Sequence, residues 1–169
     1  TTRSGGSGAS LTDANGKLLD ENNAQLFVYD VKAMKVVACC DVAESISGLV
    51  PVVDGQKVPI AFIDAVEADP EAEGKFWGVV SDTLFSFRVD MTTGAISGVK
   101  EELSMGKELY NHGGSLWYGR DILFDGDFMY VVFGSNGLYM IERENLENRY
   151  LLLAADLNAN NFGVPKRMV

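Results

Sequence analysis

One stretch of the chain gathers the side chains best suited to binding a small ligand. It is the connector 100–120, which carries Tyr110, His112, Trp117 and Arg120. Aromatic, imidazole and guanidinium groups on one loop suit stacking on a sugar or another planar ligand. The alternative is that His112, the only histidine, is a structural or solvent-exposed residue in a glycine-rich loop. We predict these four residues as candidate ligand contacts, with a carbohydrate as the candidate ligand.

A second candidate site is acidic. The stretch 65–74 carries four carboxylates, and Asp69, Glu71 and Glu73 alternate along it. Calcium prefers oxygen ligands, so the stretch is either a solvated acidic loop or a site for a divalent cation or a basic partner. A histidine-rich metal centre is excluded, because the chain has one histidine. The sequence predicts no cofactor.

The sequence contains no catalytic motif that would place a nucleophile or a nucleotide. It has no Gly-x-Ser-x-Gly elbow, no phosphate-binding P-loop and no Gly-x-Gly-x-x-Gly run. The pattern favours a protein that is not an enzyme, and it leaves the question open.

The charge of the chain limits its partners. The formal net charge is −10, which argues against nucleic acid, since binding to phosphates depends on lysine and arginine. It also argues against anionic membrane surfaces. No apolar run approaches the ~20 residues of a membrane-spanning helix. The localisation stays open, with an extracellular or periplasmic place favoured.

The only cysteines are the neighbours Cys39 and Cys40. A disulfide between neighbours needs a strained ring and closes no loop of chain. We expect two reduced cysteines in one strand, one facing each side. The alternative is a vicinal disulfide.

The elements that must position these residues are short strands. The stretch 121–157 has four apolar or β-branched runs, and turn signals such as Asp125-Gly126 and Asn136-Gly137 separate them. Turns interrupt the runs too often for a helical stripe to build up. The expected strands are Asp121–Phe124, Phe128–Phe133, Leu138–Ile141 and Tyr150–Ala154.

Two earlier stretches repeat parts of this pattern. Three leucines mark the copies, at positions 26, 84 and 138. The residues 75–82 align with 127–134 as second strands, and Val58–Asp64 aligns with the first strand. In such an up-and-down order the acidic stretch 65–74 shares one end of the sheets with 91–93 and 144–148. The connector 100–120 lies at the other end.

The pattern resembles β-propeller repeats of the quinoprotein-like or YVTN-like kind. Their blades end in a hairpin that reads leucine, aromatic, any residue, aromatic, and then Asp and Thr-Gly. Here it is carried by Leu84, Phe85, Phe87, Asp90 and Thr93-Gly94. The resemblance implies an all-β fold of antiparallel four-stranded blades, and it implies little about function.

The repeat count predicts an incomplete ring of about two and a half blades, because propellers have four to eight. The alternative fold is a β-sandwich. We expect a flexible tail or linker at 1–23, blade repeats over 24–157 and a polar tail at 158–169. Within the repeats, we expect a half blade at 24–41 and blades at 58–101 and 121–157.

These observations predict a non-enzymatic propeller segment that provides a binding or assembly surface. The expected partners are other protein chains or further blades of the same protein. One alternative is part of a propeller enzyme, glycan-active or quinoprotein-like, with catalytic residues elsewhere. The other is a cation-dependent adhesin.

Overall fold

The computed structural model describes residues 25–46, 52–53, 56–57, 63–80, 83–105, 121–133 and 137–154. Within these residues the fold is all-β and every strand pair is antiparallel, as expected from the sequence. The one helix among them, α1, has four residues (Val42–Ser45). None of the described sheets closes on itself.

A four-stranded sheet occupies the middle of the chain, and its strands follow one another in sequence order. Its strands are β5 (Ala65–Ala68), β6 (Lys75–Val80), β7 (Thr83–Val89) and β8 (Ile96–Ser104). The first strand was expected at Val58–Asp64, of which 58–62 lie outside the described residues. Ile63 and Asp64 are not in a strand, and the strand that pairs with β6 begins at Ala65, in the stretch expected to be a loop. The connection to β6 is therefore shorter than expected, because Ala65–Ala68 pairs along β6.

A second four-stranded sheet follows and has the same sequential order. Its strands are β9 (Ile122–Asp125), β10 (Phe128–Phe133), β11 (Gly137–Glu142) and β12 (Arg149–Ala154). These strands lie where turn signals and β-branched runs predicted them, within one residue at every end. Gly126 has a φ of 56° in the turn between β9 and β10, a left-handed conformation that glycine adopts without steric cost.

The N-terminal part of the described chain is a hairpin. Strand β1 (Gln25–Asp30) pairs with β2 (Lys35–Asp41), and α1 follows directly. Asp30 closes the turn because its Oδ1 accepts hydrogen bonds from the backbone amides of Lys32 and Ala33, at 2.8 and 2.9 Å. A separate pair of two-residue strands, β3 (Val52–Val53) and β4 (Gln56–Lys57), completes the described elements.

The two four-stranded sheets share the same pairing register. Leu84 pairs with Leu103 between β7 and β8, and a bulge follows at once. Leu138 pairs with Leu153 between β11 and β12, and the bulge again follows at once. A bulge leaves one residue of a strand without a direct partner. The two leucines that mark the sequence pattern thus stand at the same structural position.

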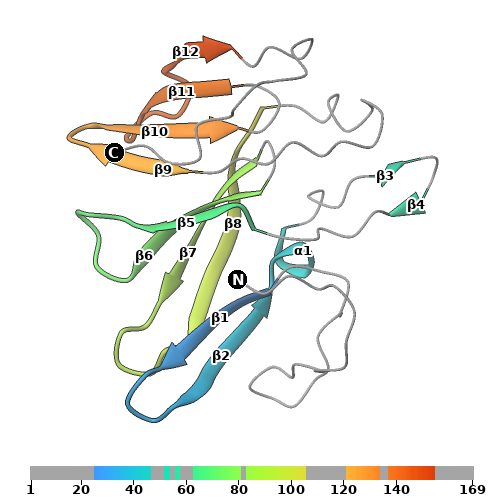
Figure 1. Cartoon of the computed structure of the whole chain (residues 1–169), viewed down its shortest axis with the longest axis vertical. Coiled ribbons are helices and arrows are strands. Elements are labelled where there is room, and N and C mark those ends of the chain that lie inside the picture. Colours follow the sequence, from blue (N-terminus) through green and yellow to red (C-terminus); the bar gives the residue numbers. More distant parts are fainter. Residues whose placement is uncertain are drawn as a thin grey trace.

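The hairpin and the two sheets stack one on another, with the hairpin at one end and the β9–β12 sheet at the other (Figure 1). Successive residues along a strand send their side chains to opposite faces of the sheet, so the middle sheet contributes to two cores. Its contact with the hairpin is built from residues of β1, α1, β6 and β7 and neighbouring segments: Leu26, Val42, Ile46, Ile63, Val80, Phe85 and Phe87.

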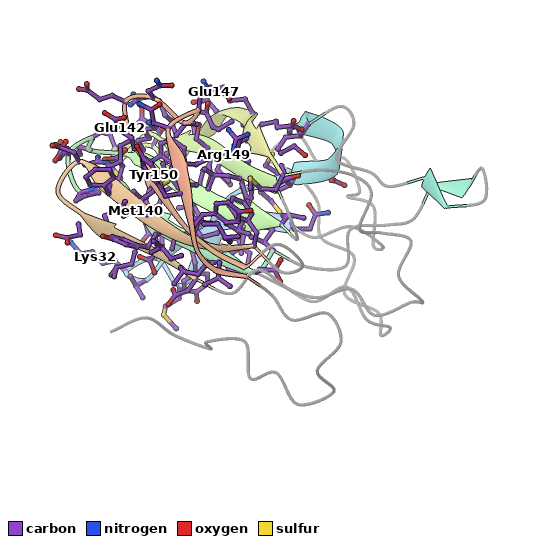
Figure 2. All side chains as sticks on the ribbon, turned by 90° about the horizontal axis from the view of Figure 1, so that it is seen from above. Lys32, Met140, Glu142, Glu147, Arg149 and Tyr150 are labelled. Atoms are coloured by element: carbon purple, nitrogen blue, oxygen red, sulfur yellow. The ribbon has the colours of Figure 1, made fainter. Side chains whose placement is uncertain are left out.

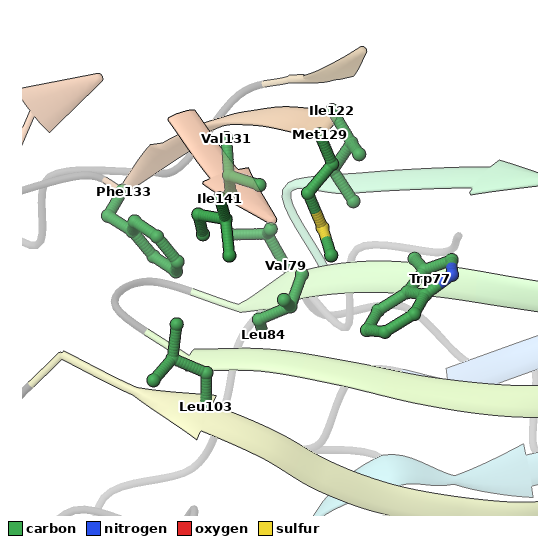
Figure 3. Packing of buried hydrophobic residues seen from close by; sticks show 9 residues of the cluster. All are labelled: Trp77, Val79, Leu84, Leu103, Ile122, Met129, Val131, Phe133 and Ile141. Carbon is green, nitrogen blue, oxygen red and sulfur yellow. The ribbon is translucent and has the colours of Figure 1, made fainter. Parts of the chain in front are cut away.

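The second core fills the space between the two four-stranded sheets (Figure 3). Its buried residues are Trp77, Val79, Leu84, Leu103, Ile122, Met129, Val131, Phe133 and Ile141. The middle sheet is therefore covered on both faces. This explains why β7 is buried over five consecutive residues, Thr83 to Phe87, instead of alternating between buried and exposed.

Candidate functional site

The predicted ligand contacts Tyr110, His112, Trp117 and Arg120 lie outside the described residues. The acidic stretch is described, and so are the two outward faces of the stack. These places are the candidates for function.

The carboxylate of Asp69 points inward and is buried. Its side chain is 4% exposed, although it belongs to a stretch expected to be solvated. Trp77 Nε1 donates a hydrogen bond to Asp69 Oδ2 at 2.9 Å, and the amide of Glu71 donates to Oδ1 at 3.1 Å. A buried carboxylate needs such partners, because an unpaired charge away from water is costly.

The charge of Asp69 is balanced by a residue of the other sheet. Arg143, in the turn after β11, places its Nη2 2.6 Å from Asp69 Oδ1. Its Nη1 lies 3.0 Å from Glu71 Oε1 and donates to the carbonyl of Gly126 at 3.1 Å. Lys75 Nζ lies 3.6 Å from Asp69 Oδ2. The turn after β11 and the loop after β5 thus share one end of the stack, as the up-and-down order predicted.

The ionised form of Asp69 is favoured in this setting. Burial by itself raises the pKa of the carboxyl, but four interactions outweigh it. They are the hydrogen bonds from Trp77 and from the amide of Glu71, and the positive charges of Arg143 and Lys75. The pKa is therefore held below its ordinary value of 3.8.

The acidic stretch is thus not a gathered set of carboxylates. Asp69 is buried in the network just described, whereas Glu71 and Glu73 are exposed, with Glu71 paired to Arg143. Among the described residues no group of three or more His, Cys, Asp or Glu is placed to hold a metal ion. What this arrangement does is fasten the two four-stranded sheets together at one end.

The outward face of the last sheet carries a row of four apolar side chains, one from each strand. Leu123, Tyr130, Met140 and Tyr150 are successive cross-strand neighbours. They stand on the side away from the second core, since their strand neighbours Ile122, Met129 and Ile141 face that core. Leu123 and Tyr150 are 39% and 55% exposed, and Figure 2 shows Met140 beside Tyr150.

We call this row the outer row. It lies toward the end of the sheet where β9 turns into β10. Asp125, Phe128 and Glu142 form the neighbouring row at the rim. At the opposite end of the same face, beyond the outer row, Val132 is buried. The open part of the face is therefore an apolar row bordered by carboxylates.

The other end of the stack has an open face too. Leu26 and Cys40 of the hairpin pack on the first core, so Phe27 and Tyr29 point to the opposite side of β1. Tyr29 pairs with Val36, and they are 42% and 44% exposed. Lys32, in the turn, is exposed at the rim of this face, whereas Lys35 pairs with Asp30 and so stands on the other face of the hairpin.

The two cysteines lie in β2 as a pair of thiols. Cys40 packs against the first core, and its Sγ lies 3.3 Å from Ser45 Oγ. Cys39 pairs with Phe27 and so belongs to the opposite face. The expected arrangement, one cysteine facing each side of a strand, is confirmed.

The sequence carries a signal for the outer row. The run Phe128–Phe133 is apolar at every position, and such a run is typical of a strand covered on both faces. In the described part of the chain only one face of β10 meets a second sheet. The apolar run of β10 thus indicates that its second face is apolar as well.

No helix among the described residues is long and apolar enough to cross a membrane. No known protein family matches this chain, and no curated protein or solved structure is significantly similar to it.

Proposed function

We propose that this chain is a non-enzymatic segment of propeller-type blades whose outward face is an assembly surface, completed by further blades or chains. The observation that carries the proposal is the outer row, Leu123–Tyr130–Met140–Tyr150. It crosses a whole sheet, consists of apolar and aromatic side chains, and has no sheet packed over it in the described part of the chain.

In the middle sheet, the face that corresponds to the outer row is covered by another sheet. Positions in the two sheets can be compared by their distance from Leu84 and Leu138, which share a register. Trp77 pairs with the residue two places after Leu84, and Tyr130 pairs with the residue two places after Leu138. Tyr130 therefore occupies the position of Trp77. Trp77 is 3% exposed because the next sheet packs on it. The same face of the last sheet is more apolar than that of the middle sheet, where Ser86 and Lys100 hold the positions of Met140 and Tyr150.

The energetics favour a covered state. Apolar surface removed from water gains roughly 25 cal/mol per Å², and large apolar patches on soluble proteins often mark interaction sites. Among the described strands, β12 also pairs on one side only, and an unpaired strand edge invites association. Four-stranded meanders stacked face to face are the arrangement of propeller blades, which supports the blade assignment.

Site-specific photo-crosslinking tests the proposal. A photoreactive phenylalanine analogue at position 130 should give a crosslinked product in the cells that make the protein. The same analogue at Thr92, exposed in the turn after β7, is the control. An assembly surface predicts a product at 130 that is absent at 92. Equal yields at the two positions, or none at either, would overturn the proposed function.

A further inference from the structure

We infer that the occupant of the outer row is the β1–β2 hairpin of a second copy of this chain, so that copies stack head to tail. This inference rests on the proposed function, namely that the outer row is an assembly surface. It adds the identity of the partner and the face that the partner uses.

The internal packing of the chain supplies the first argument. The hairpin packs on the middle sheet through Leu26 and Cys40, and the middle sheet packs on the last sheet through the face that bears Leu84. Leu26, Leu84 and Leu138 are each the second residue of their strands β1, β7 and β11. Both internal contacts thus join the leucine-bearing face of one unit to the opposite face of the next.

Within the described residues, two faces of the stack have no sheet packed on them: one is a leucine-bearing face and the other is a face of the opposite kind. The last sheet leaves its leucine-bearing face open at the outer row. The hairpin leaves open the face of Phe27, Tyr29 and Val36, which corresponds to the face of Phe85 and Phe87 in the middle sheet. In the described chain, the leucine-bearing faces of the hairpin and of the middle sheet each pack on the opposite face of another unit. The hairpin of a second copy would offer the outer row a face of this same kind.

The charges at the rim supply the second argument. Within the chain, a cation in the turn after β11 reaches a carboxylate in the loop after β5, as Arg143 reaches Asp69. In a head-to-tail contact, the turn after β1 of one copy would face the turn after β9 of the other. The first carries Lys32, and the second carries Asp125 and Asp127, all of them exposed.

The same charges argue against two copies meeting through identical outer rows. That contact would bring together two rims that each carry Asp125, Asp127 and Glu142. Like charges placed across an interface are unfavourable, and each chain already carries a net charge of −10. A contact between different faces avoids this repulsion. Contacts of this kind generate closed rings or open filaments.

The test uses the full chain and measures its mass in solution by sedimentation from micromolar to several hundred micromolar concentration. We expect mass to rise with concentration above that of one chain. The variants Tyr130→Glu, on the outer row, and Tyr29→Glu, on the hairpin, should each stay monomeric with unchanged circular dichroism. Each variant retains the face that the other has lost, so their mixture should form a one-to-one complex.

Several results would overturn the inference. A wild-type chain that stays monomeric throughout would do so, and so would a Tyr29→Glu variant that associates like wild type. A mixture of the two variants that stays monomeric would also contradict it. Crosslinks from position 130 to a different protein would leave the proposed function standing and refute the second copy. Loss of the crosslink altogether would refute both.

Charge reversal checks the contact without altering the apolar faces, in case either glutamate variant fails to fold. Asp125→Lys combined with Asp127→Lys should weaken association about 10-fold or more, a factor that corresponds to ~1.4 kcal/mol. Adding Lys32→Glu to the same chain should restore part of it. If the triple variant associates no better than the double variant, the two rims do not meet.

Discussion

Arg143 and Asp69 join the two four-stranded sheets across 74 residues of sequence. The guanidinium Nη2 lies 2.6 Å from the carboxylate Oδ1, and both side chains are largely buried. Asp69 also accepts the indole N–H of Trp77, a residue of the core between the sheets. The end of that core is thus closed by an ion pair that is hydrogen-bonded on several sides, and this explains why a carboxylate is tolerated there.

Removing the charge of Asp69 should destabilise the fold. We expect Asp69→Asn to lower the free energy of unfolding by about 2–4 kcal/mol, because Arg143 then loses its buried counter-ion and keeps only the exposed Glu71. Glu71→Gln is the matched control. Glu71 pairs with the same arginine but is 69% exposed, so its loss should cost under about 1 kcal/mol. Urea unfolding measures both, and equal costs would show that burial of the pair does not matter.

The same network predicts how stability depends on pH. The pKa of Asp69 in the folded protein lies below its ordinary value of 3.8. The stabilisation from its ionised form is therefore fully present above that value, and it is lost as the pH falls through the folded pKa. The difference in unfolding free energy between wild type and Asp69→Asn should be constant near neutral pH and shrink below 3.8. A difference that grows on acidification would contradict the assignment.

Much of the fold was predictable from local sequence. Turn pairs such as Asp125-Gly126 fix where strands end, because few other residues adopt the backbone that tight turns need. The runs between them are β-branched and aromatic. These signals placed β10 at Phe128–Phe133, as the structure has it. They failed at β5, where Ala65–Ala68 has weak strand preference and pairing along β6 decides the matter.

The register between copies was harder to predict, for a physical reason. Aligning 75–82 with 127–134 places Trp77 opposite Met129, whereas the pairing places Trp77 with Tyr130. The cause is loop length: two residues separate β6 from β7, and three separate β10 from β11. A shift of one residue moves every side chain to the other face. The outer row was therefore hidden by the sequence alignment.

The partnership of Asp69 with Arg143 was beyond the sequence as well. The up-and-down order predicted that the loop after β5 and the turn after β11 share one end of the sheets. It did not say which of the several charged residues there would meet. That choice depends on how deeply the carboxylate of Asp69 is buried beside Trp77, which donates a hydrogen bond to it. Local sequence pattern carries no information on how deeply a side chain is buried. The predicted contacts Tyr110, His112, Trp117 and Arg120 stay predictions.

Gly78 has no room for a side chain. A Cβ at this position would overlap the ring of Phe85, its cross-strand neighbour in β7. We expect Gly78→Ala to lower the free energy of unfolding by roughly 1–3 kcal/mol, as overpacking of a core does. Phe85→Leu in the same chain should recover part of that loss, since the shorter side chain frees the space. Thermal unfolding of the single and double variants decides, and strictly additive losses would rule out the steric explanation.

Two methionines test whether the outer row contributes to the fold of a single chain. Met129, in β10, is fully buried in the second core, whereas Met140, in β11, belongs to the outer row and is half-buried. Met129→Ala should cost about 2–5 kcal/mol of unfolding free energy, the range for large-to-small core substitutions. Met140→Ala should cost under about 1 kcal/mol when the chain is kept monomeric by dilution. If Met140→Ala costs as much as Met129→Ala in dilute chains, the outer row is covered within the chain itself, and an external partner is not needed. A cost at Met140 that appears only at concentrations where chains associate would place its contribution in the assembly.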